Sequence, residues 1–264
     1  MIIHNFDPVL VDFGFFQIRW YSFAYILGIL VGWIYANKII KKYNLKYITT
    51  NVFDDLIIYL ILGIIIGGRL GYVLFYNLEY YLNNFLEIFK IWNGGMSFHG
   101  GLFGVIIATI VFSKLDIKKF FSLSDIISCV APIGIFLGRV ANFINGELYG
   151  KVSSAPWAII FLNKDNMPRH PSQIYEAILE GIVLFLIINF LAFRKNLILN
   201  TGYISGLFLI LYSIFRIFAE SFREPDQHLG LLFNYFSMGT LLSIFTLITG
   251  FFIIFFIKKN EQNN

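Results

Sequence analysis

The sequence predicts an all-α polytopic membrane protein, a bundle of seven transmembrane helices with the N-terminus outside and the C-terminus in the cytoplasm. Of 264 residues, 58% are hydrophobic and only 14% are charged, with a mean hydropathy of +0.72. A soluble domain is about one-quarter charged. The apolar residues fall into seven long runs, and the basic residues between these runs alternate in abundance. We therefore expect residues 1–264 to form a single integral membrane domain.

Seven apolar runs are expected to cross the hydrocarbon core, for which a helix needs ~20 residues. They cover Trp20–Asn37, Val52–Tyr76, Phe98–Phe112, Leu123–Asn145, Gln173–Phe193, Tyr203–Phe222 and Tyr235–Ile257. The third run is the shortest, and glycines crowd its beginning. Acids and a proline, with no basic segment, precede the first run, so a cleavable signal peptide is not expected.

The basic residues set the expected orientation, because Lys and Arg near span ends accumulate on the cytoplasmic side. Eleven of the 20 lie at one set of ends, six at the other and three inside the runs. The outer segments are then roughly 1–19, 77–97, 147–172 and 223–234. Residues 147–172 form a short outer-face segment between the fourth and fifth helices. All four histidines lie in or beside these segments, so any chemistry is expected near the outer face.

Glycines recur four positions apart in several runs, a spacing that lets helix backbones approach in lipid. The pairs and triplets are Gly28 and Gly32; Gly63, Gly67 and Gly71; Gly100 and Gly104; Gly134 and Gly138; Gly202 and Gly206. We interpret them as helix-packing residues.

Six ionisable residues inside the runs need a partner or a purpose, because each costs at least ~2.5–3.5 kcal/mol on insertion scales. They are Arg69, Arg139, Glu176, Glu180, Arg216 and Glu220. Arg139 and Asn142 share one helix face, and Arg suits a phosphate because its planar, charged fork matches phosphate oxygens. Equally, Arg139 could be structural, paired with Glu147 or with an acid in another span.

The sixth run carries a polar stripe of Tyr212, Arg216, Glu220 and Arg223. Arg216 could pair with Glu220 one turn away, and Arg223 leaves this edge with net positive charge. Two arginine-bearing faces at one depth would suit an anion.

On the fifth helix, Glu176 and Glu180 lie one turn apart and would repel without a cation or a proton between them. We expect Glu176 to orient an arginine of a neighbouring helix rather than to act as a base. Arg69 is flanked by glycines and is expected to pair with an acid elsewhere in the bundle.

Two further residues have reactive side chains that could take part in a reaction. His99 lies among glycines in NGGMSFHGG and could move a proton near neutral pH, although a lone histidine is usually inert. Cys129 lies ten residues before Arg139, about 15 Å toward the cytoplasmic side on a helix, so it is not the nucleophile of an outer-face site. The histidine spacing does not suggest a metal site, and the small net charge of +4 does not suggest nucleic acid.

Six stretches resemble a known family when taken in order. They are RWY at 19–21, GGRLGYVLFYN at 67–77, NGGMSFHGGL at 93–102, GRVANFINGELYG at 138–150, RHPSQIYEAILEG at 169–181 and FRIFAESFREPD at 215–226. Together they resemble the prolipoprotein diacylglyceryl transferases of bacterial plasma (inner) membranes.

The resemblance implies a multi-pass transferase with its active site toward the outer face. Its substrates would be phosphatidylglycerol, a membrane lipid, and the signal peptide of a prolipoprotein with a lipobox cysteine, and it would use no cofactor or metal. The reaction would form a thioether and release glycerol 1-phosphate. Catalytic roles would fall on His99, as base for the thiol, and on Arg139 and Arg216, as phosphate ligands. The family's supporting and substrate-binding positions would fall on Tyr21, Asn142, Gly150, Glu176, Glu220 and Arg223.

The chain departs from the family pattern at two places. Ala141 replaces a glycine that is usual before the Asn-Phe pair, and the segment between Tyr149 and Arg169 is short. Two other classes remain open: a transporter or lipid flippase that uses the internal charges to bind its substrate, and a non-catalytic receptor for signal peptides. Release of glycerol 1-phosphate separates the transferase from both.

Overall fold

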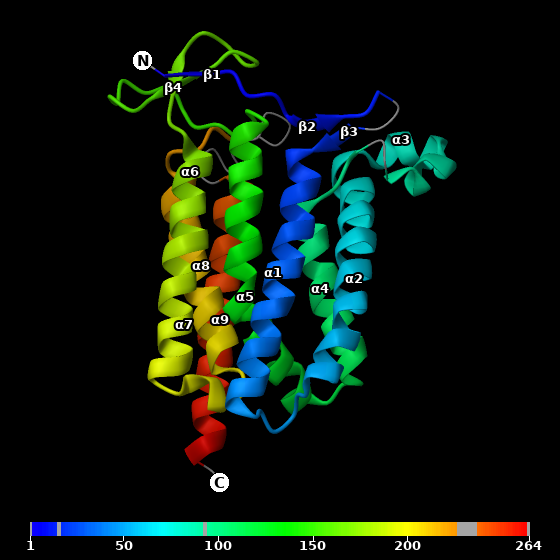
Figure 1. Cartoon of the computed structure of the whole chain (residues 1–264), viewed down its shortest axis with the longest axis vertical. Coiled ribbons are helices and arrows are strands. Elements are labelled where there is room, and N and C mark those ends of the chain that lie inside the picture. The colour runs from blue at the N-terminus through cyan, green and yellow to red at the C-terminus, as the bar shows by residue number, and fades with distance from the viewer. Residues whose placement is uncertain (1, 15–16, 92–93, 226–236, 263–264) are drawn as a thin grey trace. The chain divides into compact units, whose positions relative to one another are not determined.

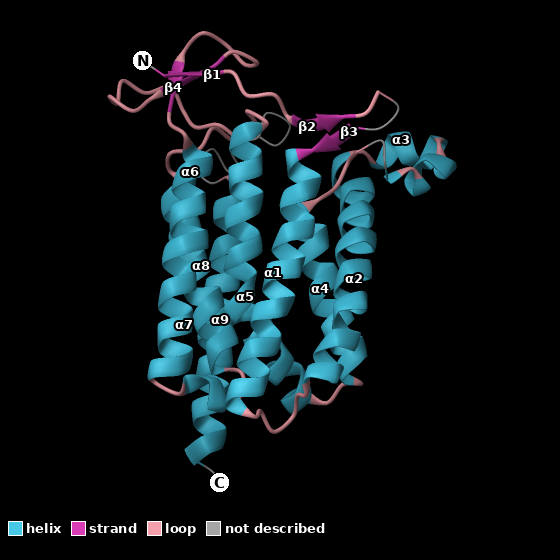
Figure 2. Ribbon diagram, viewed as in Figure 1, coloured by secondary structure: helices cyan, strands magenta, loops and turns pink. Residues whose placement is uncertain are grey.

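The computed structural model describes residues 2–14, 17–91, 94–225 and 237–262, except for the side chains of 98, 99 and 260–262. The chain forms two compact units, one of residues 1–36 with 125–264 and one of residues 37–124. Figure 1 colours the chain by residue number, and Figure 2 shows that helices dominate its structure.

Each predicted span coincides with helical structure in the residues that are described; the first two residues of the seventh, 235 and 236, lie outside them. The helices are α1 (Trp20–Tyr43), α2 (Thr50–Tyr76), α4 (Phe98–Ser113), α5 (Ile117–Ile144), α8 (Tyr203–Glu220), α9 (Met238–Gln262), and a continuous helix made of α6 (Ser172–Glu176), the π-helical η3 (Ala177–Val183) and α7 (Leu184–Arg194). Among the described residues, six helices are long and apolar enough to cross a membrane, whereas α4 is a shorter apolar helix. The prediction of a helical, polytopic membrane protein is therefore confirmed.

Several short elements were not predicted. They are β1 (Ile2–His4), β2 (Val9–Asp12), β3 (Gln17–Arg19), β4 (Ile159–Phe161), β5 (Pro168–Arg169), α3 (Leu78–Asn83), η1 (Phe85–Phe89) and η4 (Leu197–Leu199). Strands of two to four residues are too short to show an alternating pattern, so the sequence carries no clear signal for them.

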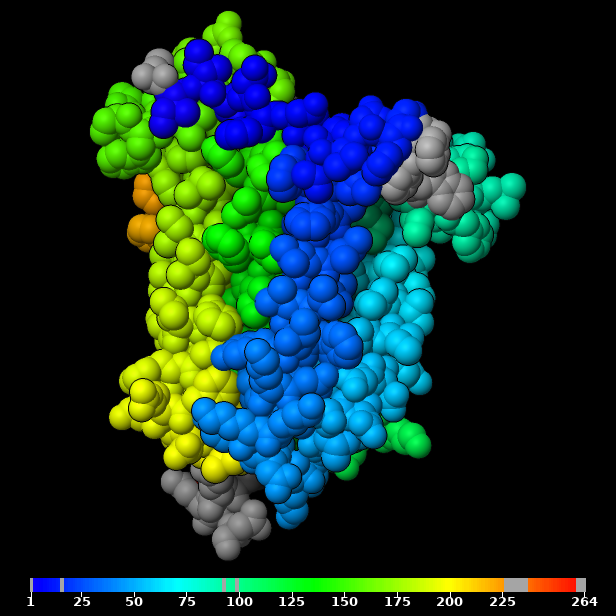
Figure 3. All heavy atoms as spheres, in the orientation of Figure 1, coloured from blue at the N-terminus to red at the C-terminus, as the bar shows by residue number. Residues whose placement is uncertain are grey.

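The first unit has a small sheet in the strand order β1, β4, β5 at the end of its helices opposite the C-terminus (Figure 1). β1 pairs in parallel with β4, so that Ile3 lies opposite Ile160. The buried His4 ring contacts Phe143 and Phe161, and its Nε2 lies 2.6 Å from the carbonyl oxygen of Phe143 near the end of α5. Figure 3 shows the N-terminal segment lying against the segment that follows α5. The N-terminus therefore helps to hold residues 147–172 in place.

Toward the other end of this unit lies a buried acidic residue, Asp125, that was not predicted from the sequence. Asp125 of α5 is 1% exposed and accepts hydrogen bonds from the amides of Gly202 (2.6 Å) and Ser205 (2.8 Å) and from the hydroxyl of Ser205 (2.6 Å). These groups lie at the beginning of α8, where free amides and the helix dipole favour a negative charge. Asp125 thus fixes the start of the helix that carries Arg216.

In the second unit, glycines bring α2 and α4 into backbone contact, as predicted. A Cβ on Gly71 would lie 2.7 Å from the Cα of Gly100, and a Cβ on Gly67 would lie 2.8 Å from the Cα of Gly104. The amide of Ser97 also donates to the carbonyl of Gly68 at 2.8 Å. The first turn of α4 is therefore tied directly to α2.

Arg69 has a different role from the predicted pairing with an acid. The side chain is buried and donates to the carbonyls of Glu87 (2.5 Å), Ile88 (2.8 Å), Lys90 (3.2 Å), Gly94 (2.5 Å) and Gly95 (3.1 Å). Its guanidinium also lies 5.1 Å from the ring centroid of Tyr81. Backbone carbonyl oxygens surround this cation and no acidic side chain is needed, so the sequence carries no signal for the arrangement. Arg69 gathers the segment that leads into α4.

The glycine contacts predict a difference between two neighbouring substitutions. In Gly67→Ala the new methyl group meets the backbone of Gly100 and Gly104, whereas in Gly68→Ala it meets the flexible end of Met96. Overpacking against backbone costs about 1–3 kcal/mol. Thermal unfolding of the detergent-solubilised protein should therefore show a clearly lower Tm for Gly67→Ala and little change for Gly68→Ala. Equal Tm values for the two variants would contradict this packing.

Candidate active site

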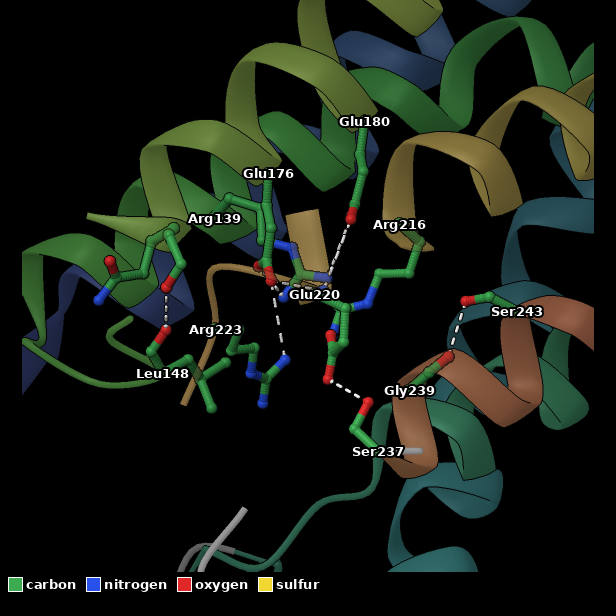
Figure 4. Close-up of polar contacts among 12 residues, drawn as sticks. Arg139, Leu148, Glu176, Glu180, Arg216, Glu220, Arg223, Ser237, Gly239 and Ser243 are labelled. Carbon is green, nitrogen blue, oxygen red and sulfur yellow. Dashed lines mark hydrogen bonds and ion pairs between the residues drawn. The ribbon is translucent and has the colours of Figure 1, made fainter. Parts of the chain in front are cut away.

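A cluster of buried charges lies in the first unit, where α5, the helix that begins with α6, and α8 meet (Figure 4). Its members are Arg139 of α5, Glu176 of α6, Glu180 of η3, Arg216 and Glu220 of α8, and Arg223, which follows α8. We call these six residues the charge cluster. All of them were singled out from the sequence.

Glu176 joins two of the arginines and lies close to the third. Its Oε2 lies 2.9 Å from Nη1 of Arg139, and its Oε1 lies 2.5 Å from Nη1 of Arg216. Nη1 of Arg223 is 3.8 Å from the same Oε1. This confirms that Glu176 orients arginines of neighbouring helices, and it rejects Glu147 as the principal ion-pair partner of Arg139.

Glu180 and Glu220 complete the ion pairs. Glu180 lies 3.1 Å from Nη2 of Arg139 and 3.5 Å from Nη1 of Arg216. Glu220 lies 2.7 Å from Nη2 of Arg216, one helical turn away, which is one of the alternatives that the spacing left open. Arg216 is therefore held from both sides, by the helix that begins at Ser172 and by its own helix.

A close helix contact explains why Arg139 reaches both glutamates. A Cβ on Gly181 in η3 would lie 2.9 Å from the Cα of Phe136 in α5, one turn before Arg139. Only glycine allows this approach. Glu176 and Glu180 flank the start of the π-helical segment, a type of helix that is rare and often found at functional sites.

The cluster contains three guanidinium and three carboxylate groups, so it is formally neutral when all are ionised. The net positive edge predicted for the sixth span is compensated in the assembled cluster, because Glu176 and Glu180 come from another helix. The side chains of Glu176 and Glu180 are 0% exposed, whereas that of Arg139 is 12% exposed. Buried ions that are mutually paired form a set of rigid, already oriented N–H donors.

Asparagines next to the cluster hold the chain after α5. The side-chain amides of Asn142 and Asn145 donate to Oε1 of Glu147 at 2.8 and 3.4 Å. The side-chain amide of Gln173 donates to the carbonyl of Glu147 at 2.6 Å. Asn142 is buried, so this predicted site residue supports the turn that leaves α5.

Gly150 lies where residues 147–172 meet the end of α8. Its amide donates to the carbonyl of His170 at 2.9 Å, and it forms an antiparallel bridge with Arg223. A Cβ at this position would lie 2.5 Å from the His170 carbonyl oxygen and 2.7 Å from that of Phe222. Gly150 therefore has no room for a side chain, and its contacts help to place Arg223.

Arg169 is a residue of this region that was not predicted to belong to the site; it is one of the six basic residues at the outer ends of the spans. It is buried, bonds to Asp165 (2.6 Å), Gly150 (3.1 Å) and Glu224 (3.3 Å), and lies over the ring of Tyr149. Its position three residues before Ser172, beside other polar residues, gave no clear sign of burial. Arg169 therefore links both ends of residues 147–172 to Glu224, which follows Arg223.

Two predicted site residues are less closely tied to the cluster. The hydroxyl of Tyr21, in the first turn of α1, lies 3.2 Å from that of Tyr25. His99 lies in the first turn of α4, within the unit of residues 37–124, but its side chain is outside the described residues. His228 also lies outside them. Cys129 is buried in α5. Among the described residues, no group of three or more His, Cys, Asp and Glu could hold a metal ion.

Comparison with known proteins identifies one family. The family model described as prolipoprotein diacylglyceryl transferase matches residues 8–256. The chain is 50% identical over 250 residues to the phosphatidylglycerol–prolipoprotein diacylglyceryl transferase of Rickettsia canadensis (strain McKiel), covering 95% of this chain and 96% of that protein. It is 49% identical over 254 residues to the protein of the same name from Rickettsia felis, covering 96% and 98%.

The geometry of the charge cluster predicts a large stability loss for Glu176→Gln. The substitution leaves Arg139 and Arg216 short of a buried carboxylate, and breaking a buried ion pair costs about 3–5 kcal/mol. Glu224→Gln is the matched control, because Glu224 is 37% exposed and Arg169 keeps its bond to Asp165. Exposed pairs contribute about 0–1 kcal/mol. Chemical unfolding should separate the two variants, and equal losses would contradict the assigned importance of Glu176.

The Arg169 contacts predict that part of the folding stability is lost at low pH. Hydrogen bonds from Arg169 hold the pKa of the Asp165 carboxyl below its usual value. A carboxyl with a depressed pKa stabilises the fold above its unfolded pKa, about 3.9, and this contribution is lost as pH falls through the folded pKa. Between about pH 5 and pH 2, Tm should therefore fall less in Asp165→Asn than in the unaltered protein. An identical fall in both proteins would rule out this contribution.

Proposed function

The chain belongs to the prolipoprotein diacylglyceryl transferase family, and we propose that it carries out the first step of bacterial lipoprotein maturation. It transfers the diacylglyceryl group of phosphatidylglycerol to the thiol of the lipobox cysteine in a prolipoprotein signal peptide. The observation that carries this proposal is the buried charge cluster, in which carboxylates of other helices fix arginines suited to a phosphate. The relatives' printed names supply the two substrates.

The reaction is a substitution at an sp3 carbon. The thiol loses its proton, and the thiolate forms a C–S bond to the glycerol carbon that carries the phosphate. The C–O bond to the phosphate breaks, and its electron pair leaves with glycerol 1-phosphate. The phosphate gains one negative charge in this step, so cations near its bridging oxygen stabilise the transition state more than the ground state. No acyl-enzyme and no nucleophile of this chain is required.

The arginines of the cluster are assigned to the phosphate. Each guanidinium has five N–H groups in a fixed fork, so Arg139 and Arg216 can be positioned by glutamates and still donate to phosphate oxygens. Because the cluster has no formal net charge, it does not attract every anion strongly. Its attraction for the phosphate rises as negative charge develops on the leaving oxygen. Glu176, Glu220 and Arg223 support these two arginines.

The remaining roles follow the family's motif positions. His99, in the first turn of α4, is the base that removes the thiol proton. Tyr21, Asn142 and Gly150 belong to the substrate-binding region, the last two through the turn that they stabilise after α5. We assign the chain to the bacterial plasma (inner) membrane with α4 as a seventh crossing. The N-terminus and the charge cluster then face outward, and the C-terminus lies in the cytoplasm, as the distribution of Lys and Arg favours.

The activity is tested with purified protein, phosphatidylglycerol and a lipobox peptide. We expect the peptide mass to increase by one diacylglyceryl group, with release of an equal amount of glycerol 1-phosphate. His99→Ala and Arg139→Ala should lower the rate by at least about 100-fold, because a general base and a charge-stabilising donor each contribute about that factor or more. Size-exclusion chromatography and Tm show whether the variants remain folded.

The same assay distinguishes a transferase from a transporter and from a signal-peptide receptor. A peptide whose lipobox cysteine is replaced by serine should remain unmodified and release no glycerol 1-phosphate. Movement of phosphatidylglycerol across proteoliposomes without this product would identify a transporter, and peptide binding alone would identify a receptor. Full activity of both folded variants would overturn the roles assigned to His99 and Arg139.

A further inference from the structure

Glu220 contacts a helix that contributes no charge to the cluster. One oxygen, Oε2, faces Nη2 of Arg216 at 2.7 Å, while the other, Oε1, accepts a hydrogen bond from the hydroxyl of Ser237 at 2.8 Å (Figure 4). Ser237 directly precedes α9. The carboxylate is therefore shared between the arginine and the beginning of α9.

Ser237 is itself held in place by α9. Its Oγ accepts from the amide of Thr240 at 3.1 Å and lies 3.1 Å from the Thr240 hydroxyl. This is the usual geometry of a serine that caps a helix N-terminus. The same helix end carries the positive end of the helix dipole, which favours a carboxylate such as that of Glu220.

Gly239 lies against the same carboxylate. A Cβ at this position would lie 2.8 Å from Oε1 of Glu220 and 2.9 Å from both its Cδ and Oε2. Any side chain here would displace the carboxylate. Ser237 supplies the hydrogen bond and Gly239 supplies the space, and we call these two residues the glutamate seat.

The packing of α8 against α9 keeps the seat in register with Arg216. Gly206 and Gly250 bring the two backbones together, and the hydroxyls of Ser213 and Thr246 lie 2.7 Å apart. Glu176 holds Nη1 of Arg216 and Glu220 holds Nη2. Displacement of Glu220 would remove the ion pair at Nη2 of Arg216 and allow its guanidinium plane to turn.

We propose that the glutamate seat positions Arg216 for catalysis, so that Ser237 and Gly239 are positioning residues that act through Glu220. This inference rests on the proposed function, because it assumes that Arg216 stabilises the charge that develops on the phosphate. It assigns a catalytic contribution to the beginning of α9, which carries no charged group in the cluster.

The first test compares Ser237, which precedes α9, with a serine inside α9. In Ser237→Ala, kcat should fall about tenfold, since a hydrogen bond to a charged group is lost, while the KM for phosphatidylglycerol changes by less than about threefold. Ser243→Ala is the matched control. Ser243 is buried and donates to the carbonyl of Gly239 within its own helix at 2.7 Å, so this variant should stay near the unaltered rate. Ser237→Thr retains the hydroxyl and should restore most of the activity.

The second test asks whether Ser237 acts through Glu220. In the background of Glu220→Gln, a further Ser237→Ala should lower kcat by less than about twofold, because residues that act through one another give non-additive effects. Independent, multiplying losses would overturn the proposal, as would a Ser237→Ala variant with unaltered kcat. Gly239→Ala should lose activity in the same direction, with Tm measured in parallel.

The outcome separates this inference from the proposed function. If the unaltered protein does not release glycerol 1-phosphate, the proposed function fails and the comparison of serines has no basis. If it does so and the folded Ser237→Ala and Ser243→Ala variants behave alike, only the glutamate seat is rejected.

Discussion

The ion pairs of Glu176 with Arg139 and Arg216 are the interaction on which the candidate site depends. A charge buried in a membrane protein needs a partner, and this carboxylate, which is 0% exposed, serves two arginines from two other helices at 2.9 and 2.5 Å. Glu180 and Glu220 then complete the balance of three guanidinium and three carboxylate groups. The result is a set of oriented donors with no formal net charge, which can respond to charge that develops on a phosphate.

Much of the surrounding fold holds the partners of Glu176 at the required separation. Gly181 allows α5 to approach the helix that carries the two glutamates, and Asp125 fixes the beginning of α8. Gly150 and Arg169 connect the segment after α5 to the residues that follow α8. In the other unit, Arg69 and the glycines of α2 fix the first turn of α4, where His99 lies.

The sequence predicted the helices and the members of the charge cluster because both follow from the cost of polar groups in lipid. A run of about 20 apolar residues has few alternatives to a helix, and a glutamate such as Glu176 inside such a run requires a cation. It did not predict which partners would meet. Arg69 binds backbone carbonyls, Asp125 binds helix amides, and Arg169 reaches Gly150 and Glu224 in addition to the nearby Asp165. Apart from Asp165, these partners are backbone groups or distant residues with no characteristic spacing. The parallel pairing of β1 with β4 joins segments more than 150 residues apart, and local patterns cannot show it.

The central claim is that Arg139 and Arg216, oriented by Glu176, receive the phosphate of the lipid. A structure of the protein with phosphatidylglycerol bound tests this most directly. We predict phosphate oxygens about 2.7–2.9 Å from guanidinium nitrogens of both arginines, with Glu176 still bound to each. A phosphate bound elsewhere, with both arginines contacting only their glutamates, would contradict the assignment.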